Sequence, residues 1–181
     1  MYLDCPERYI KRNNKRGIIM HNYEELYKKL IDNRWFENCG DKEVVYENLD
    51  YIWAKDMKDV EKNVNSIKWE NMYIEEMNEI TMFLDMNYLE LSMLWNEQIE
   101  MIERKYMVEL RKRIREAANK HSLPERVVSQ VGYALKIIFI CEFYSEQYHS
   151  EFYENLLEIY LSGHLPCGYK GRYRKGSIII Y

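Results

Sequence analysis

The chain has 181 residues, of which 47 % are hydrophobic and 31 % charged, and its formal net charge is −4. This length fits one domain, and the composition is that of a globular protein, which excludes a disordered chain. The four cysteines lie far apart and form no CxxC pair, which excludes a disulfide scaffold and favours reduced thiols in the cytosol. They are Cys5, Cys39, Cys141 and Cys167.

Residues 1–21 form a basic segment, with cations at Lys11, Arg12, Lys15 and Arg16. The segment is charged where a secretory signal needs an apolar run, so we expect a basic extension or a small hairpin. Residues 127–141 are the most apolar stretch, but Lys136 interrupts them and they are too short to span a bilayer. We therefore expect a cytoplasmic protein without membrane contact.

Two helices are predicted after the basic segment. Asn22 and Glu25 have the spacing of an N-terminal capping pair, and Gly40 ends the helix that they begin. Asp41 begins a second predicted helix, because apolar residues then recur on one face at helical spacing. These residues are Val45, Leu49, Ile52, Trp53, Met57 and Val60.

A longer helical region follows, since residues 67–119 contain no glycine or proline. One helix of that length would be unusual in a globular domain. We expect a break near residues 85–87, where the Asp and Asn side chains compete for backbone hydrogen bonds.

The strongest local signal is Ser-Leu-Pro-Glu at residues 122–125, which has the pattern of a capping box with proline in the first turn. The helix that follows is apolar almost all round, which is typical of the central helix of a bundle. A last helix is predicted over residues 151–161, closed by Gly163.

The tail, residues 164–181, contains Gly168, Gly171 and Gly176 before a β-prone run at residues 178–181. We expect turns at the glycines and then a short strand, which we pair with residues 17–20. The predicted fold is mainly α: a single-domain antiparallel helical bundle over residues 22–163 with a short C-terminal turn and strand tail in the same domain.

The sequence contains only isolated residues that are suited to metal or nucleophilic chemistry. Glu146 and His149 match the Glu-x-x-His motif of di-iron bundles once, where two copies are needed. His164 and Cys167 are one pair of zinc ligand types, whereas zinc sites usually show paired ligands at two places. No nucleophile motif and no glycine-rich phosphate loop is present. We therefore predict that the protein is not an enzyme and that it holds no metal or cofactor.

A basic stretch at residues 104–115 is the main argument for nucleic-acid binding. Its cations precede Ser122 and a second helix, which loosely matches helix-turn-helix spacing. That second helix continues into an apolar run that is unsuited to contact with DNA. The cations of the stretch are Arg104, Lys105, Arg111, Lys112, Arg113 and Arg115.

Acidic residues are also segregated. Residues 69–103 contain nine carboxylates and no Lys or Arg, whereas a solvated helix face normally mixes charge signs. An ordinary solvated surface is one interpretation. The other is a negative field that attracts a basic partner, with a partner-binding face on the two predicted helices. The predicted partner-binding residues are Glu70, Glu75, Glu79, Asp85, Glu90, Glu97 and Glu100.

The closing segment GHLPCGYKGRYRKGSIIIY, residues 163–181, resembles the C-terminus of bacterial immunity proteins of contact-dependent growth inhibition and polymorphic toxin systems. The runs VGYALKIIF and NRWFENCG also fit that family. In the form associated with it, a proline often follows the second tail aromatic, where this chain has Arg174 after Tyr173. The resemblance implies a cytosolic protein that binds and blocks the toxic domain of a toxin, often a nuclease.

Two functions therefore remain open from the sequence. The first is an immunity protein that neutralises a cognate toxin domain, with a nuclease as the expected class, through its acidic helical surface. The second is a helical nucleic-acid-binding or regulatory protein that uses residues 104–115. Homo-oligomerisation is left open.

Overall fold

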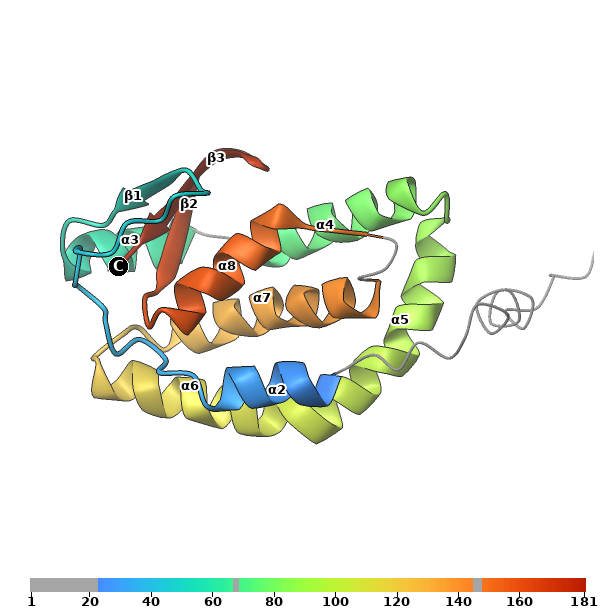
Figure 1. The fold of residues 1–181 in the computed structure, drawn as a ribbon, viewed down its shortest axis with the longest axis horizontal. Coiled ribbons are helices and arrows are strands. Elements are labelled where there is room, and N and C mark those ends of the chain that lie inside the picture. Colours follow the sequence, from blue (N-terminus) through green and yellow to red (C-terminus); the bar gives the residue numbers. More distant parts are fainter. Residues whose placement is uncertain (1–22, 67–68, 145–147) are drawn as a thin grey trace, which may run out of the picture.

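The structure, a computed structural model, describes residues 23–66, 69–144 and 148–181 (Figure 1). Helices account for 62 % of the structure, which confirms the predicted mainly α fold. The predicted extension or hairpin over residues 1–21 lies outside the described residues, and so does its pairing with the tail.

Most of the elements along the chain are helices. Segments that are far apart in the sequence form a small sheet. They are α2 (Tyr23–Ile31), β1 (Tyr51–Trp53), α3 (Met57–Ser66), α4 (Trp69–Phe83), α5 (Tyr88–Ile102), the π-helical η1 (Glu103–Met107), α6 (Val108–Lys120), α7 (Arg126–Phe143), α8 (Glu151–Leu161), β2 (Pro166–Arg172) and β3 (Lys175–Ile180). The segments α5, η1 and α6 are continuous, and the helix changes direction near the π-helical segment (Figure 1).

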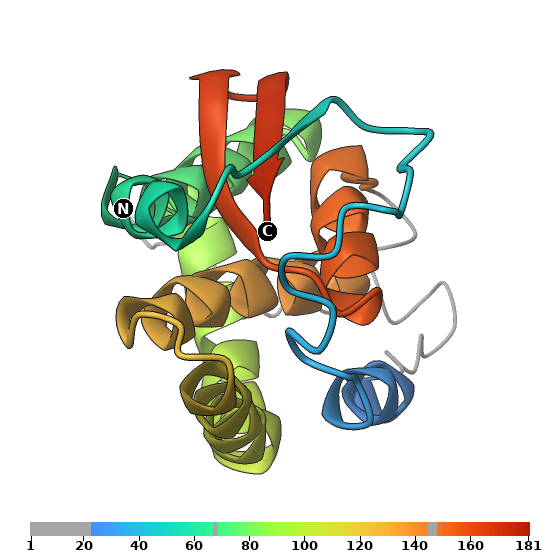
Figure 2. The same cartoon turned by 90° about the vertical axis from the view of Figure 1, so that its left-hand side faces the viewer.

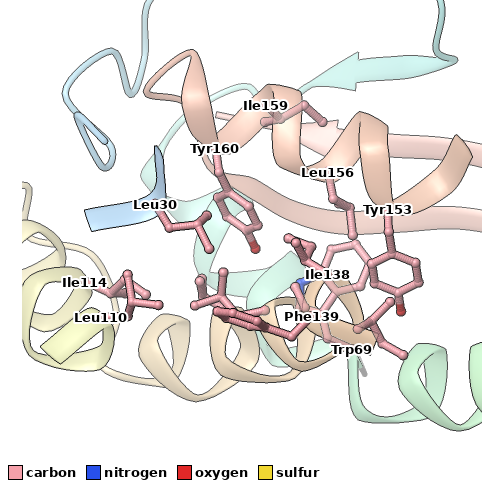
Figure 3. Packing of buried hydrophobic residues seen from close by; sticks show 14 of the residues in the cluster. Leu30, Trp69, Leu110, Ile114, Ile138, Phe139, Tyr153, Leu156, Ile159 and Tyr160 are labelled. Carbon is pink, nitrogen blue, oxygen red and sulfur yellow. The ribbon is translucent and has the colours of Figure 1, made fainter. Parts of the chain in front are cut away.

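Helix α7 is the centre of the bundle. Helices α4, α6 and α8 pack against it, and α2 lies against α6 (Figures 1 and 2). Eleven of its 18 residues are buried, more than in any other described helix. Figure 3 shows Phe139 of α7 among side chains of α2, α6 and α8, including Leu30, Leu110 and Tyr160. The prediction that the helix after Pro124 is the central helix of the bundle is confirmed, and its sequence offers no polar face to solvent.

The sheet lies at one end of the bundle and has the strand order β1-β3-β2. Strands β2 and β3 form an antiparallel hairpin, while β1 pairs in parallel with β3, so that Ile52 stands opposite Ile179. Ile178, Ile179 and Ile180 are buried, which confirms a terminal strand docked on the body.

The glycines of the tail do not form the turns that were predicted for them. Gly171 and Gly176 are paired residues of the two strands, and a Cβ on Gly176 would lie 2.2 Å from the carbonyl oxygen of Lys170. The hairpin turn is Tyr173–Arg174 instead, with Arg174 in the left-handed region at φ 57°. The prediction of turns at all three glycines is therefore wrong, because Gly171 and Gly176 permit close approach of the strands.

The predicted second helix from Asp41 is also wrong. Residues 41–50 are not helical, and the segment then enters β1. The amide of Ile178 donates to the carbonyl of Asp50 at 2.9 Å, and the amide of Ala54 donates to the carbonyl of Ile180 at 2.8 Å. Pairing with a strand more than 120 residues away overrides the local apolar spacing, and Val45 is exposed.

The first helix is shorter than predicted, since α2 ends at Ile31 and residues 32–40 form turns, with Gly40 at φ 86°. The expected capping box at Ser122 is absent. Ser122 has φ 54°, and the amide of Leu123 donates to the carbonyl of Ala118 at 2.8 Å. Ser122 therefore closes the C-terminal end of α6 in a left-handed conformation and does not cap α7.

Two boundaries were predicted correctly. Helix α4 ends at Phe83, and Asn87 forms a capping box with Glu90 at the start of α5, which confirms the break near residues 85–87. Helix α8 has the predicted bounds, and Gly163 follows it at φ 84°.

Candidate partner-binding surface

Helices α4 and α5 meet at a corner that carries most of the predicted partner-binding residues (Figure 1). Residues 75–97 make up this surface, which we call the acidic corner. Glu75, Asp85, Glu90 and Glu97 are exposed there, and Glu79 is half-buried. Glu70 and Glu100 are exposed too, but they lie at the far ends of α4 and α5, each roughly 20 Å along its helix from the turn. Five of the seven predicted residues therefore lie within about 15 Å of the turn, measured along their helices.

Some of these carboxylates already have partners within the chain. Glu90 closes the capping box of α5, and Glu100 lies 3.4 Å from Arg104. Glu79 lies 4.0 Å from Arg174. Among the residues that the structure describes, Glu75, Asp85 and Glu97 form no ion pair. Three charges of the acidic corner therefore remain available to a partner.

An exposed apolar patch lies within the acidic corner. Met82 is 71 % exposed and Leu89 is 69 % exposed, and they stand on either side of the turn. Of the ten large hydrophobic residues that are exposed in the described chain, five lie between residues 82 and 93. They are Met82, Phe83, Tyr88, Leu89 and Met93. Clustered exposed apolar side chains with a polar rim are typical of surfaces that bind another protein.

A buried carboxylate holds the acidic corner to the rest of the molecule. Glu76 of α4 is fully buried and accepts a hydrogen bond from the hydroxyl of Tyr148 at 2.6 Å. The guanidinium of Arg174, at the hairpin turn, donates to both of its oxygens at 2.7 and 2.8 Å, and Tyr173 donates to it as well. This network joins α4, the segment before α8 and the tail.

The two tyrosines of this network stay protonated. Burial raises the pKa of Tyr148 and of Tyr173, and the negative charge of Glu76 raises both further. Each therefore keeps its hydroxyl proton and donates it to the carboxylate. Glu76 is enclosed and both of its oxygens accept hydrogen bonds, so a substrate cannot reach it. Its role is to support the surface.

The basic stretch of η1 and α6, the alternative site, has most of its charge neutralised by the chain itself. Four of its six cations lie near carboxylates: Arg104 near Glu100, Lys105 near Glu24, Arg111 near Glu103 and Lys112 near Glu109. The helix that would have to enter a DNA groove is α7, which is the core of the bundle. Both observations disfavour a nucleic-acid interface on this stretch.

Among the candidate metal ligands, His164 has a structural role. His164 is fully buried, where its Nδ1 lies 3.0 Å from the hydroxyl of Tyr46 and its Nε2 lies 2.9 Å from the carbonyl oxygen of Asp41. His149 is exposed and lies 3.2 Å from Glu154, while Glu146 is outside the described residues. Within the described ranges, no group of three His, Cys, Asp or Glu residues is placed to hold a metal ion.

Comparison with known proteins adds no relative: the chain matches no family model, and no curated protein or solved structure shows significant similarity to it. Over the described part of the chain, no helix is long and apolar enough to cross a membrane.

Two features of the surface were missed in the sequence. The apolar patch was detectable, because Met82 and Phe83 lie outside the apolar stripe of α4, formed by Trp69, Met77 and Ile80, and stand beside a predicted break. The pairing of Glu76 with Arg174 had no local signal, since the two residues are 98 positions apart.

Proposed function

We propose that this protein binds a basic partner protein through the acidic corner, and that it acts as an immunity protein that neutralises a toxin domain, with a nuclease as the expected class. The observation that carries the proposal is the combination of unpaired carboxylates with an exposed apolar patch on one corner. The resemblance of residues 163–181 to immunity proteins supplies the kind of partner.

The charge of the corner selects among partners. Nucleases carry Lys and Arg where they hold phosphate groups, so a negative surface is attracted to the site that must be blocked. Nucleic acid and anionic lipid would be repelled by Glu75, Asp85 and Glu97. A second copy of the chain is disfavoured as well, because a symmetric contact through this corner would bring like charges together.

The apolar patch provides the affinity that charge alone does not. Interface energy is concentrated in a few apolar or aromatic side chains that become fully buried, while charges at the rim govern the association rate. Burying one exposed Leu, Met or Phe side chain contributes about 1.5–3 kcal/mol. Phe83 and Leu89 are the expected anchors, and Glu75 and Glu97 are part of the rim.

The test is a reversal of charge on the corner. A candidate toxin domain, taken from a reading frame next to the gene for this protein, is coexpressed with the wild type and with the triple variant Glu75→Lys, Glu79→Lys, Glu97→Lys, and the purified pairs are titrated at two salt concentrations. We expect the triple variant to fold, to bind much more weakly and to lose protection. The remaining binding should depend less on salt.

A matched control separates the surface from the net charge. Glu43, Glu47 and Glu61 are exposed and lie outside the acidic corner, so reversing all three to Lys changes the formal charge by the same amount. This control should bind and protect like the wild type. Equal protection by both triple variants would place the interface elsewhere, and a wild type that binds nucleic acid but no toxin domain would refute the immunity function.

A further inference from the structure

The basic segment that precedes α2, residues 1–21, matches the acidic corner in charge. Its residues 8–20 carry five cations and no acid, whereas the acidic corner, residues 75–97, contains six carboxylates and no Lys or Arg. The same part of the basic segment ends in an aliphatic run, Ile18, Ile19 and Met20. Cations and aliphatic side chains are what a surface with carboxylates and an exposed apolar patch would bind.

The basic segment joins the described chain beside α5. Helix α2 begins next to the C-terminal half of α5 (Figure 1), where the hydroxyl of Tyr23 donates to the side-chain oxygen of Gln98 at 3.4 Å. From Gln98 to Tyr88, the first residue of α5, is about 15 Å along the helix. Arg16 precedes Tyr23 by seven residues and Lys11 precedes it by twelve, and extended chains of these lengths span at most about 25 and 40 Å. The cations of the basic segment can therefore reach the acidic corner.

An exposed stripe of α5 leads from this point to the turn between α4 and α5. Leu89, Met93 and Glu97 are spaced four residues apart and are all exposed, so they lie on one face of the helix. Met82 and Phe83 extend the apolar part of this surface on the other side of the turn. Exposed apolar side chains gathered in one place usually mark a surface that another polypeptide covers.

The covalent link favours the basic segment over a free ligand of the same chemistry. Two groups joined by a short linker meet at an effective concentration on the order of millimolar, so a contact of modest affinity is already well populated. The cations of residues 104–115, in contrast, are fixed on η1 and α6, and four of the six lie beside carboxylates there or on α2 and α5. Both facts favour the basic segment as the part of the chain that covers the acidic corner.

We propose that the basic segment binds the acidic corner of its own chain. Its cations lie beside Glu75, Asp85 and Glu97, and its aliphatic run covers the apolar patch. A basic partner protein must then displace the basic segment, so the segment competes with every partner and only a partner with a higher affinity for the corner removes it. The contact itself does not depend on the proposed function.

The contact can be tested in the full chain by NMR of the methionine methyl groups. The methyl signals of Met82 and Met93, assigned with Met82→Leu and Met93→Leu, should differ between the wild type and a neutralised chain. Added salt should move the wild-type signals towards those of the neutralised chain, because exposed charge pairs are screened. The signal of Met107, which is fully buried in η1, should not move. The neutralised chain carries Lys11→Gln, Arg12→Gln, Lys15→Gln and Arg16→Gln.

A peptide makes the test independent of the covalent link. A synthetic peptide of residues 8–22 is added to the neutralised chain, and it should move the two methionine signals to their wild-type positions. Reversing Glu75, Glu79 and Glu97 to Lys in the same chain should weaken the peptide about tenfold, which is the combined loss of three exposed ion pairs.

The triple control at Glu43, Glu47 and Glu61 changes the charge by the same amount outside the acidic corner and should bind the peptide like its parent. Three results would each overturn the proposal. They are identical Met82 and Met93 signals in the wild type and the neutralised chain, equal peptide affinity of the two triple variants, and signal positions that depend on protein concentration, which would assign the contact to a second copy of the chain. No toxin domain takes part in these measurements, so their result is separate from that of the proposed function.

Discussion

The acidic corner and the basic stretch of η1 and α6 are both strongly charged, but they use their charges differently. In the basic stretch, four of six cations lie beside carboxylates of the same chain. In the acidic corner, Glu75, Asp85 and Glu97 have no cation beside them within the described residues, and apolar side chains are exposed among them. The comparison teaches that segregated charge in a sequence does not locate an interface, because pairing in the folded state decides which charges remain for a partner.

The largest expected effect separates two neighbouring acids of α4. Glu76→Gln removes the buried charge to which Arg174, Tyr148 and Tyr173 all donate, and it leaves Arg174 only the more distant Glu79, at 4.0 Å. We expect a loss of about 3–5 kcal/mol in the free energy of unfolding. Urea denaturation measures it. The control Glu75→Gln changes an exposed acid one position away and should stay within about 0.5 kcal/mol of the wild type. Equal stability of the two variants would mean that the buried network contributes nothing.

The next effect tests whether the exposed apolar patch belongs to the interface. Phe83→Ser and Leu89→Ser should each weaken binding to the proposed toxin partner by about 2 kcal/mol, the size of an interface hot spot. Calorimetric titration of the purified pair gives the value. Val108→Ser is the matched control, because Val108 is also exposed but lies on α6. If the control weakened binding as much as the other two, the patch would not be the anchor.

A smaller effect is expected in the basic stretch of η1 and α6, where the carboxylate of Glu103 is paired with cations. Burial disfavours ionisation of Glu103, but the hydrogen bonds and charges of Arg111 and Lys136 outweigh it, and the pKa of Glu103 is lowered. A depressed carboxylate pKa adds stability above the unfolded pKa of about 4.3, and this stability is lost as the pH falls through the folded value. Glu103→Gln should therefore cost about 1 kcal/mol at pH 7 and progressively less below about pH 4.

Denaturation of both proteins at pH 7, 5 and 3.5 checks this. The difference between wild type and variant should be the same at the two higher pH values and smaller at the lowest. A difference that grows as the pH falls would contradict the assigned direction of the pKa shift.

The smallest effect is expected at the cations of the basic stretch that form no ion pair with a described residue. Arg113→Gln and Arg115→Gln should leave the affinity for the toxin domain unchanged, since both residues lie outside the acidic corner. The same titration measures it. A steep loss in either variant would transfer the interface from the acidic corner to α6.

Parts of the site were predictable because they depend on short-range rules. The break at residues 85–87 and the capping box of Asn87 with Glu90 follow from side chains that bond to the backbone three positions away. The outward position of Glu75 and Glu97 follows from the apolar residues that recur at helical spacing on the opposite faces of the two helices. These are Trp69, Met77 and Ile80 on α4, and Leu91, Trp95 and Ile102 on α5. The wrong placement of a capping box at Ser122 shows the limit of such rules, because the local pattern did not reveal that Ser122 takes the left-handed conformation that ends the preceding helix.

The sequence by itself determined the helical class, the central place of α7 and the terminal strand, because each depends on how apolar residues repeat along one segment. The tertiary structure alone decided that residues 51–53 join a sheet, that Glu76 is buried against Arg174, and that α2 begins beside α5. These features depend on residues up to about 130 positions apart, and no local period encodes which distant partner a strand, a carboxylate or a helix will meet.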